Sequence, residues 1–342
     1  MNAAIIGASG YAGEETVRLL TRHPRLHLAA VTSRQFKGKT LGQVVGALTR
    51  RHDLVFEDLS PEEVAQRAEI FFLAVPHGVA SEYAVPLRQA GKIVVDLSAD
   101  FRLRDPAVYQ EFYGHPHPAP DYLKEAVYAL PELHAEEIKK SDLLASPGCY
   151  PTSILLALAP ALKAHLIDPA TIVSNSLSGV TGAGKKAEIP LLFGEIGESL
   201  RAYGLPKHRH LSEIEQEIAL LTGKKTPITF IPHLVPLNRG ILSTVTATLL
   251  GTVNGDSEEK VLALYRDFYR DKPFVRVLDR ETLPEVRRVA RTNFVEIGLR
   301  VDARTGRLIV VSVIDNLVKG TAGQAIQAAN LRLGWPEEEG LL

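Results

Sequence analysis

The feature that most restricts the fold of this chain is the alternation of short apolar runs with amphipathic stretches over its first third. Runs rich in β-branched or aromatic residues predict strands over residues 3–6, 26–33, 70–75 and 93–97, and the stretch 12–22 has the pattern of a helix. Strands that alternate with helices form βαβ units and a parallel sheet. Near-continuous apolar strands favour a sheet covered on both faces. We therefore expect an α/β domain built on a parallel sheet.

A glycine-rich turn joins the first expected strand to the first expected helix. It has the spacing G-x-x-G-x-x-G rather than the stricter G-x-G-x-x-G of dinucleotide-binding folds. Glycines allow a tight turn and a close approach of the backbone, and a helix N-terminus receives a pyrophosphate. The alternative is a plain strand-to-helix turn. The residues predicted to bind a dinucleotide here are Gly7, Ser9, Gly10, Tyr11, Ala12 and Gly13.

The end of the second expected strand indicates which dinucleotide is bound. An NAD site usually has an Asp or Glu about 20 residues after the glycines, to bind the ribose 2′-OH. This chain has Ser33 and Arg34 there, and a hydroxyl and a guanidinium both bind a 2′-phosphate. We therefore predict NADP rather than NAD, with a solvated surface charge as the alternative for Arg34. Pro76, His77 and Ser98 follow later strands and are expected to line the same cleft, with His77 more a turn residue than a general base.

The second half of the chain has a different pattern. At 342 residues the chain exceeds the size of most single cores, so two domains are expected. Runs that alternate polar and apolar residues favour a mostly antiparallel sheet with one solvated face. The segment 105–131, rich in Pro, Tyr and His, is expected to be irregular and to cross the surface. The later strands are expected over residues 171–178, 227–232, 241–250, 294–301 and 308–314, and helices over 212–221, 258–269 and 321–333.

The only cysteine, Cys149, stands where a loop enters an apolar, helix-patterned run over residues 154–162. A helix N-terminus favours a thiolate through its dipole and its unsatisfied N–H groups. Such sites lower the thiol pKa from about 8.5 and activate the nucleophile. We predict a nucleophilic cysteine, the alternative being a small apolar residue in a loop.

A polar cluster before the helix expected at 212–221 offers partners for this thiol. His208 and His210 lie in it, Ser212 is placed to cap the helix, and Glu213 is placed to fix the tautomer of His210. A thiol, an imidazole and an orienting carboxylate make an activated nucleophile. The sequence leaves both histidines open and favours His210. A solvated basic loop is the alternative, and no metal site is predicted because no ligand set completes these histidines.

Bulk properties exclude several classes of protein. The net charge of −1 offers no field to attract nucleic acid or an anionic membrane. A single cysteine forms no internal disulfide, which favours a reducing compartment. No signal peptide and no apolar run of about 18 residues is visible. We expect a cytoplasmic protein with no membrane or nucleic-acid partner.

Taken together, these motifs resemble the N-acetyl-gamma-glutamyl-phosphate reductase family of arginine biosynthesis, within the aspartate-semialdehyde dehydrogenase-like group. The resemblance is carried over nearly the whole chain, most specifically by residues 147–152 together with 208–210. It implies a Rossmann-type NADP-binding domain over 1–148, completed by a C-terminal helix in 316–342 that brings Asn316 near the nicotinamide. It also implies an α+β catalytic and subunit-contact domain over 149–315, in a homodimer or homotetramer. The segments 193–200 and 205–207 depart from the family pattern, and a lysine-pathway relative acts on a carrier-bound acyl phosphate.

The resemblance further implies the reaction. N-acetyl-L-glutamyl 5-phosphate is reduced by NADPH to the 5-semialdehyde, through a Cys149 thioester and with His210 or His208 as general acid/base. A cofactor-free thiol hydrolase and a nonenzymatic NADP sensor are the rivals from other classes. The candidates for binding the anionic substrate are Arg102, Ser178, Lys185, Arg209 and Arg239.

Overall fold

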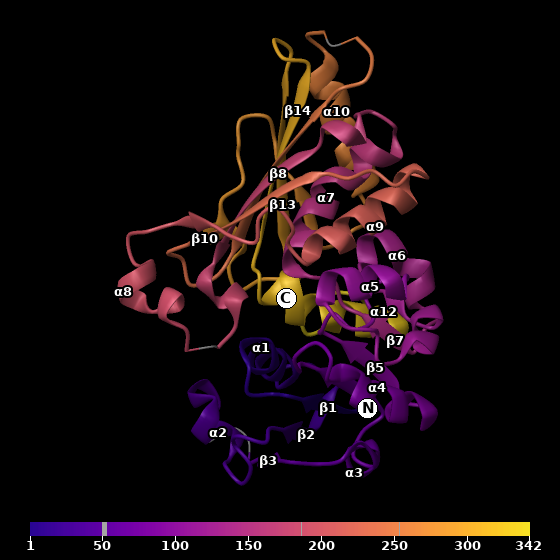
Figure 1. Cartoon of the computed structure of the whole chain (residues 1–342), viewed down its shortest axis with the longest axis vertical. Coiled ribbons are helices and arrows are strands. Elements are labelled where there is room, and N and C mark those ends of the chain that lie inside the picture. The colour runs from indigo at the N-terminus through magenta and orange to yellow at the C-terminus, as the bar shows by residue number, and fades with distance from the viewer. Residues whose placement is uncertain (50–52, 186, 253) are drawn as a thin grey trace. The chain divides into compact units, whose positions relative to one another are not determined.

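The computed structural model describes residues 1–49, 53–185, 187–252 and 254–342 (Figure 1). Contacts divide the chain into two compact units, the first made of Met1–Pro147 with Thr321–Leu342 and the second of Gly148–Gly320. Each unit is built around one seven-stranded sheet.

The sheet of the first unit has the order β3-β2-β1-β4-β5-β7-β6, and every neighbouring pair is parallel. This confirms the expected parallel sheet. All of β4 and four of the five residues of β1 are buried, as expected of strands covered on both faces. The strands are β1 (Asn2–Ile6), β2 (His27–Thr32), β3 (Phe56–Glu57), β4 (Ile70–Leu73), β5 (Ile93–Asp96), β6 (Val127–Tyr128) and β7 (Leu143–Ala145).

The helices of the first unit connect these strands, and the last one comes from the C-terminal segment. That helix, α12, packs against α6, α1 and β5, so the end of the chain completes the unit that its beginning started. The helices are α1 (Tyr11–Leu20), α2 (Leu41–Val44), α3 (Pro61–Ala65), α4 (Ala80–Gln89), α5 (Pro106–Tyr113), α6 (Pro131–Ile138) and α12 (Gly323–Arg332), with 3-10 turns η1 (Gly46–Leu48) and η2 (Pro120–Lys124).

The segment 105–131 was expected to be irregular, and this prediction is wrong. Asp105 caps α5 by accepting a hydrogen bond from the N–H of Ala107 (2.8 Å), and Pro106 occupies the first helical position. Gly114, with φ of +81°, ends the helix. Tyr109 and His117 are buried, so the segment is packed rather than a surface crossing. Its start and stop residues are ordinary helix signals that the Pro- and His-rich composition obscured.

The sheet of the second unit has the order β12-β13-β14-β11-β8-β10-β9. Four of its six neighbouring pairs are antiparallel, and β12–β13 and β8–β10 are parallel. The expectation of a mostly antiparallel sheet is confirmed. The strands are β8 (Val173–Gly179), β9 (Arg201–Ala202), β10 (Thr229–Val235), β11 (Ile241–Thr248), β12 (Val275–Val277), β13 (Val295–Asp302) and β14 (Arg307–Ile314).

One long helix, α7, lies against strands β11 and β14 of this sheet and also contacts α9 and α10. It is buried from Tyr150 to Leu162. The helices are α7 (Cys149–Lys163), α8 (Phe193–Ile196), α9 (His210–Thr222), α10 (Ser257–Phe268) and α11 (Val286–Val289), with short turns η3 (Pro169–Thr171), η4 (Val180–Ala183), η5 (Ile189–Leu191) and the π-helical η6 (Val318–Ala322). None of the helices in the described residues has the length and apolar character needed to cross a membrane.

The face of the sheet under α7 carries buried serines. The serines of β8 are on its buried side, so the polar half of its alternation points inward. Ser153 of α7 donates a hydrogen bond to Ser243 (2.9 Å) and lies 3.1 Å from the Ser312 hydroxyl, and Ser243 lies 2.7 Å from Ser176. Because hydrogen bonds are directional and apolar contacts are not, this network fixes where α7 sits along the sheet.

Candidate active site

Cys149 is the first residue of α7, as predicted, and its side chain is partly exposed. Gly148 occupies the N-cap position without a side chain to cap the helix. The N–H groups of the first turn and the positive end of the helix dipole therefore lie at the thiol, which favours the thiolate. The backbone of η6 also packs close to it, because a Cβ added to Gly320 would lie 2.8 Å from Cys149 Cβ.

His210 is the first residue of α9 and packs directly on the residue before the cysteine. A Cβ added to Gly148 would lie only 2.6 Å from His210 Nε2. The fully buried Glu213 accepts a hydrogen bond from the Gly148 N–H through Oε2 (3.0 Å), and its Oε1 lies 3.9 Å from His210 Nε2. Glu213 thus joins the chain before Cys149 to the first turn of α9, with its carboxylate near the imidazole.

The start of α9 differs from the predicted cap. Arg209 occupies the N-cap position, and the Ser212 hydroxyl donates to the Arg209 carbonyl (2.7 Å) instead of capping the helix. The helix begins two residues earlier than expected, so Ser212 is already inside its first turn. Glu213 is in that turn, as predicted.

His208 lies in a box of aromatic rings formed with Tyr150, Tyr203 and Phe230. Its Nδ1 accepts a hydrogen bond from the His210 N–H (3.1 Å). Burial, with a smaller contribution from the positive charge of Arg209, lowers the pKa of His208 to about 4. The ring is therefore neutral at pH 7 and does not act as an imidazolium acid there.

Two tyrosines at this site were not found from the sequence. Tyr203 donates a hydrogen bond to the Tyr150 hydroxyl (3.0 Å), and Tyr150 donates to the His233 carbonyl (3.2 Å). Burial raises the pKa of Tyr203 to about 12 and also raises the pKa of Tyr150, so both phenols stay protonated. The adjacency of Tyr150 to Cys149 was visible in the sequence, whereas the contact with Tyr203 depends on the fold.

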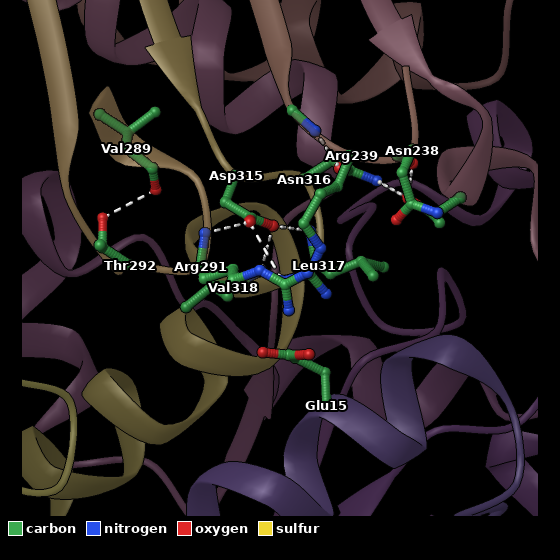
Figure 2. A network of polar contacts seen from close by, with 12 residues as sticks. Glu15, Asn238, Arg239, Val289, Arg291, Thr292, Asp315, Asn316, Leu317 and Val318 are labelled. Atoms are coloured by element: carbon green, nitrogen blue, oxygen red, sulfur yellow. Dashed lines mark hydrogen bonds and ion pairs between the residues drawn. The ribbon is translucent and has the colours of Figure 1, made fainter. Parts of the chain in front are cut away.

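Arg239, a predicted substrate residue, lies in the loop between β10 and β11, and Figure 2 shows its surroundings. Its Nη1 is 3.2 Å from Oδ2 of the buried Asp315. The next residue, Asn316, accepts from the Gly240 N–H (2.6 Å) and donates to the Thr181 hydroxyl (3.0 Å). The Asn316 amide therefore holds the loop that carries Arg239, and its expected place near the nicotinamide stays a prediction.

The other predicted substrate residues differ in their surroundings. Ser178 is buried and its hydroxyl donates to the Gly179 carbonyl (3.0 Å), whereas Lys185 and Arg209 are exposed. These three residues share the second unit with Cys149. Arg102 belongs to the first unit, where it is 8% exposed and donates to the carbonyls of Ser146 (2.7 Å) and Leu97 (2.9 Å).

The glycine loop has the close backbone packing that its spacing predicts. Gly7 has φ of +82°, and a Cβ there would lie 2.7 Å from the Ala74 carbonyl oxygen. A Cβ on Gly13 would lie 2.5 Å from the Gly7 carbonyl oxygen, so the loop folds tightly onto the start of α1. At Gly10, the N-cap of α1, such a Cβ would have no atom of the described part of the chain within 4 Å. This open space beside a helix N-terminus, next to Tyr11 and Ala12 in the first turn, fits a pyrophosphate.

The end of β2 places the predicted 2′-phosphate residues beside this loop. The hydroxyls of Ser9 and Ser33 lie 2.9 Å apart, which joins the loop to the strand end. The Arg34 side chain is 77% exposed, with its Nε 3.8 Å from Asp58. A hydroxyl and a solvent-accessible guanidinium therefore follow β2, and both groups are of types that can bind phosphate.

The remaining predicted cofactor residues follow strands β4 and β5. Pro76 and His77 are exposed, and the His77 ring packs edge-on against Tyr113. Ser98 is buried, and its hydroxyl donates to the Asp96 carboxylate (2.9 Å). Burial, together with the nearby charge of Asp100, raises the pKa of Asp96 to about 7.

Asp100 was missed by the sequence reasoning and organises these turns. Its fully buried carboxylate accepts from the Gly78 N–H (2.6 Å), the Ser81 N–H (3.2 Å) and the Tyr109 hydroxyl (3.3 Å). The turn after His77 is therefore fixed by a residue from the next strand end. No cluster of three or more His, Cys, Asp or Glu residues within the described ranges is arranged to hold a metal ion.

Comparisons with known proteins match both parts of the chain. The family description "Semialdehyde dehydrogenase, NAD binding domain" matches residues 2–141, and "Semialdehyde dehydrogenase, dimerisation domain" matches residues 149–316. A protein of Geobacter metallireducens named N-acetyl-gamma-glutamyl-phosphate reductase is 51% identical over 342 residues, which cover 100% of this chain and 98% of that protein. The protein of the same name from Geotalea daltonii is 50% identical over 342 residues, with coverage of 100% and 98%.

The chain belongs to the N-acetyl-gamma-glutamyl-phosphate reductase family. The resemblance inferred from the sequence motifs is thereby confirmed, and the first unit is a nicotinamide-dinucleotide-binding domain. For this reductase-family chain, solved aspartate semialdehyde dehydrogenases show the same fold. The enzyme II structure from Vibrio cholerae has a TM-score of 0.73 at 19% identity, covering 97% of this chain and 98% of that one. The Candida albicans enzyme, solved with NADP, has a TM-score of 0.70 at 16% identity, with coverage of 96% and 97%.

Proposed function

We propose that this protein catalyses the NADPH-dependent reduction of N-acetyl-L-glutamyl 5-phosphate to N-acetyl-L-glutamate 5-semialdehyde with release of phosphate. One observation carries the proposal within a family of that name: the single cysteine opens α7, and His210 packs on the glycine immediately before it. The first unit would hold the dinucleotide, and the second unit, Gly148–Gly320, would carry the covalent chemistry.

In the first step the Cys149 thiolate attacks the C5 carbonyl carbon of the acyl phosphate. A carbon–sulfur bond forms, the carbon–oxygen bond to phosphate breaks, and phosphate leaves with the bonding electron pair. The N–H groups at the start of α7 stabilise the oxyanion that develops on the carbonyl oxygen. The Gly148 N–H is not assigned to this role because it donates to Glu213.

NADPH, when bound, supplies the hydride that reduces the thioester carbon. The oxygen on that carbon takes up a proton. The aldehyde is released when the proton is removed again, the carbonyl re-forms and the carbon–sulfur bond breaks, which returns Cys149 to the thiolate. We assign general acid/base work to Nε2 of His210, since this atom lies beside the residue before Cys149 and near the Glu213 carboxylate. The rings of neutral His208 and protonated Tyr150 pack edge-on against the His210 ring.

The choice of NADP over NAD rests on the end of β2. Ser33 and Arg34 are proposed to bind the 2′-phosphate, and the pyrophosphate is proposed to lie over Gly10 at the start of α1. The proposed location is the cytoplasm, because a chain with one cysteine forms no internal disulfide and is therefore compatible with a reducing compartment.

We also propose that the protein forms a homodimer or a homotetramer, in which the subunits contact each other through Gly148–Gly320. The sheet face away from α7 is only partly covered, although several of its side chains are apolar. A half-exposed apolar sheet face of this kind is typical of a subunit interface. The apolar residues of that face are Val173, Leu177, Leu242, Ile309 and Val311.

The test runs the reaction in the oxidative direction. NADPH formation from NADP and N-acetylglutamate semialdehyde is followed with and without phosphate, for the wild type and Cys149→Ser. Phosphate-dependent turnover that disappears in the variant supports the proposal. Activity with aspartate semialdehyde instead would overturn the substrate, and NADP binding without turnover of either aldehyde would favour a sensor. Phosphate-independent hydrolysis of a thioester or ester without cofactor would favour a thiol hydrolase.

A further inference from the structure

The buried carboxylate of Asp315 joins separate segments of the second unit around Arg239 (Figure 2). Its Oδ2 accepts from Arg239 Nη1 (3.2 Å) and from the Arg291 N–H (2.6 Å). Its Oδ1 accepts from the N–H groups of Leu317 (2.9 Å) and Val318 (3.2 Å). Four donors match the number of lone-pair sites that a carboxylate offers.

Two of these segments have unusual backbone conformations. Arg291 has φ of +66°, in the left-handed region that non-glycine residues seldom adopt. Leu317 precedes the π-helical η6 and Val318 is the first residue of η6, a rare form that is frequent at functional sites. Strained backbone persists where its surroundings over-determine it, and here the N–H groups of both segments are fixed by one carboxylate.

The loop that carries Arg239 is held from several sides. Asn316 accepts from the N–H of Gly240, and the Thr181 hydroxyl donates to the Asn238 carbonyl (2.7 Å). Gly179 packs so closely that a Cβ there would lie 2.8 Å from the backbone nitrogen of Arg239. Two successive residues therefore hold different parts of this loop: Asn316 binds its backbone, and Asp315 binds the Arg239 guanidinium.

We propose that Asp315 is a positioning residue that orients the Arg239 guanidinium to receive an anionic group of the substrate, its carboxylate or its phosphate. This inference rests on the proposed function, which supplies a substrate with both groups. An arginine side chain has large rotamer freedom, and a fixed partner removes that freedom before the substrate arrives. The Arg239 side chain is 12% exposed, so it is held but still reaches solvent.

The backbone of Asp315 also contacts the segment that packs on the nucleophile. The Asp315 carbonyl accepts from the Gly320 N–H (2.9 Å), and Gly320 is the residue that packs on Cys149. Asp315 therefore links the geometry of the anion-binding arginine to the geometry of the cysteine, although it touches neither substrate nor thiol.

The test replaces Asp315 by Asn. This substitution keeps the shape of the side chain but replaces one acceptor oxygen by an NH2 group, which faces the donors and cannot accept from them. Both carboxylate oxygens have two donors, so neither orientation of the amide satisfies them. We expect the KM for phosphate or for the aldehyde to rise about tenfold or more, since a misplaced binding group weakens binding steeply. A rise for phosphate alone assigns Arg239 to the phosphate, and a rise for the aldehyde alone assigns it to the carboxylate.

A double-mutant cycle separates positioning from general stability. In an Arg239→Gln background, Asp315→Asn is expected to change the KM by less than about twofold, because the residue through which it acts is gone. Additive effects of the two substitutions would overturn the proposal. Asp279→Asn is the matched control, since it breaks an exposed Arg266–Asp279 pair in the same unit (2.6 Å) and is expected to leave the KM unchanged.

A binding measurement keeps this test independent of turnover. Thermal stabilisation by inorganic phosphate and by N-acetyl-L-glutamate is measured for the wild type and Asp315→Asn. Loss of the shift for one of these probes supports the proposal even if the protein turns over neither aldehyde, an outcome that would reject the proposed function alone. Equal shifts in both proteins would overturn the proposal. If Asp315→Asn does not fold, Asp315→Glu, which keeps the charge but lengthens the side chain, is measured in the same way.

Discussion

The imidazole of His210 lies against the α-carbon of Gly148, so close that a Cβ at position 148 would be 2.6 Å from Nε2. Glycine at this position is therefore required by the neighbour and not by the backbone, whose φ of −66° suits any residue. The contact fixes the distance between the start of α9 and the start of α7, where the histidine and the cysteine stand.

The first prediction follows from this contact. Gly148→Ala forces His210 away from the residue before the nucleophile, and we expect kcat to fall about 100-fold, the size reported for displacements of about 1 Å in a catalytic site. The assay is phosphate-dependent NADPH formation. Gly255→Ala is the control, because a Cβ there meets none of the described residues within 4 Å, and it should retain full activity. Full activity in Gly148→Ala would show that His210 does not need its place against Gly148.

The second prediction concerns pH and His208. Its pKa is lowered from 6.5 to about 4 by burial, so the unfolded state binds more protons than the folded state between these values. Stability contributed by the neutral ring is thus complete above pH 6.5 and is lost as the pH falls toward 4, by an amount on the order of 3 kcal/mol.

Urea unfolding at several pH values measures this effect. His208→Asn supplies an amide oxygen in place of Nδ1 and removes the titrating group, so its stability should vary less between pH 6.5 and 4 than that of the wild type. His27→Asn, at an exposed position, should follow the wild-type curve. Parallel curves for wild type and His208→Asn would contradict the assigned burial of the neutral ring.

Features that depend on neighbours in sequence were predictable from the chain alone. The strand, the glycine loop and α1 are consecutive, and Cys149 stands at the start of α7 because the apolar helical run begins just after it. The parallel sheet followed from the same alternation. The helix α5 also has local sequence signals, the capping Asp105, Pro106 and Gly114. It was missed because composition was given more weight than these helix-capping residues.

Features made by residues far apart were not predictable. Asp315 meets Arg239 across 76 residues of sequence, and Tyr203 meets Tyr150 across 53. A single sequence shows neither register nor which loops meet, so the residues that orient Arg239 and shape the His208 box left no local pattern. The inward serines of β8 are a related case, because alternation identifies two faces without identifying which one is buried.

The third prediction concerns those serines. Ser153→Ala removes a hydroxyl that lies within hydrogen-bond distance of both Ser243 and Ser312, which leaves buried polar groups short of a partner. We expect a loss of about 1–3 kcal/mol in the free energy of unfolding, measured in urea. Ser199→Ala, at an exposed site, should change the stability by less than about 0.5 kcal/mol. A further Ser243→Ala substitution should cost less in the Ser153→Ala background than alone, because the two hydroxyls share one bond.

The last prediction separates the two roles of glycine in the dinucleotide loop. Gly13 is enclosed by protein, because a Cβ added there would lie 2.5 Å from the Gly7 carbonyl oxygen, so Gly13→Ala should lower the melting temperature even without cofactor. A Cβ on Gly10 would have no atom within 4 Å from residues 1–49, 53–185, 187–252 or 254–342, and the φ of −78° at Gly10 accepts alanine. Gly10→Ala should therefore leave the stability of the protein without cofactor unchanged.

The same Gly10→Ala variant should bind NADPH about tenfold or more weakly, because the added methyl group occupies the space into which a pyrophosphate approaches the start of α1. Fluorescence titration with NADPH measures the affinity, and thermal unfolding without cofactor measures the stability. Gly46→Ala, on an exposed turn of the same unit with equally open surroundings, is the matched control for both measurements. Unchanged NADPH affinity in Gly10→Ala would contradict the assignment of the pyrophosphate to this helix terminus. A loss of affinity without a loss of stability would support the assignment, because the substitution adds only a methyl group at a position where the described residues leave open space.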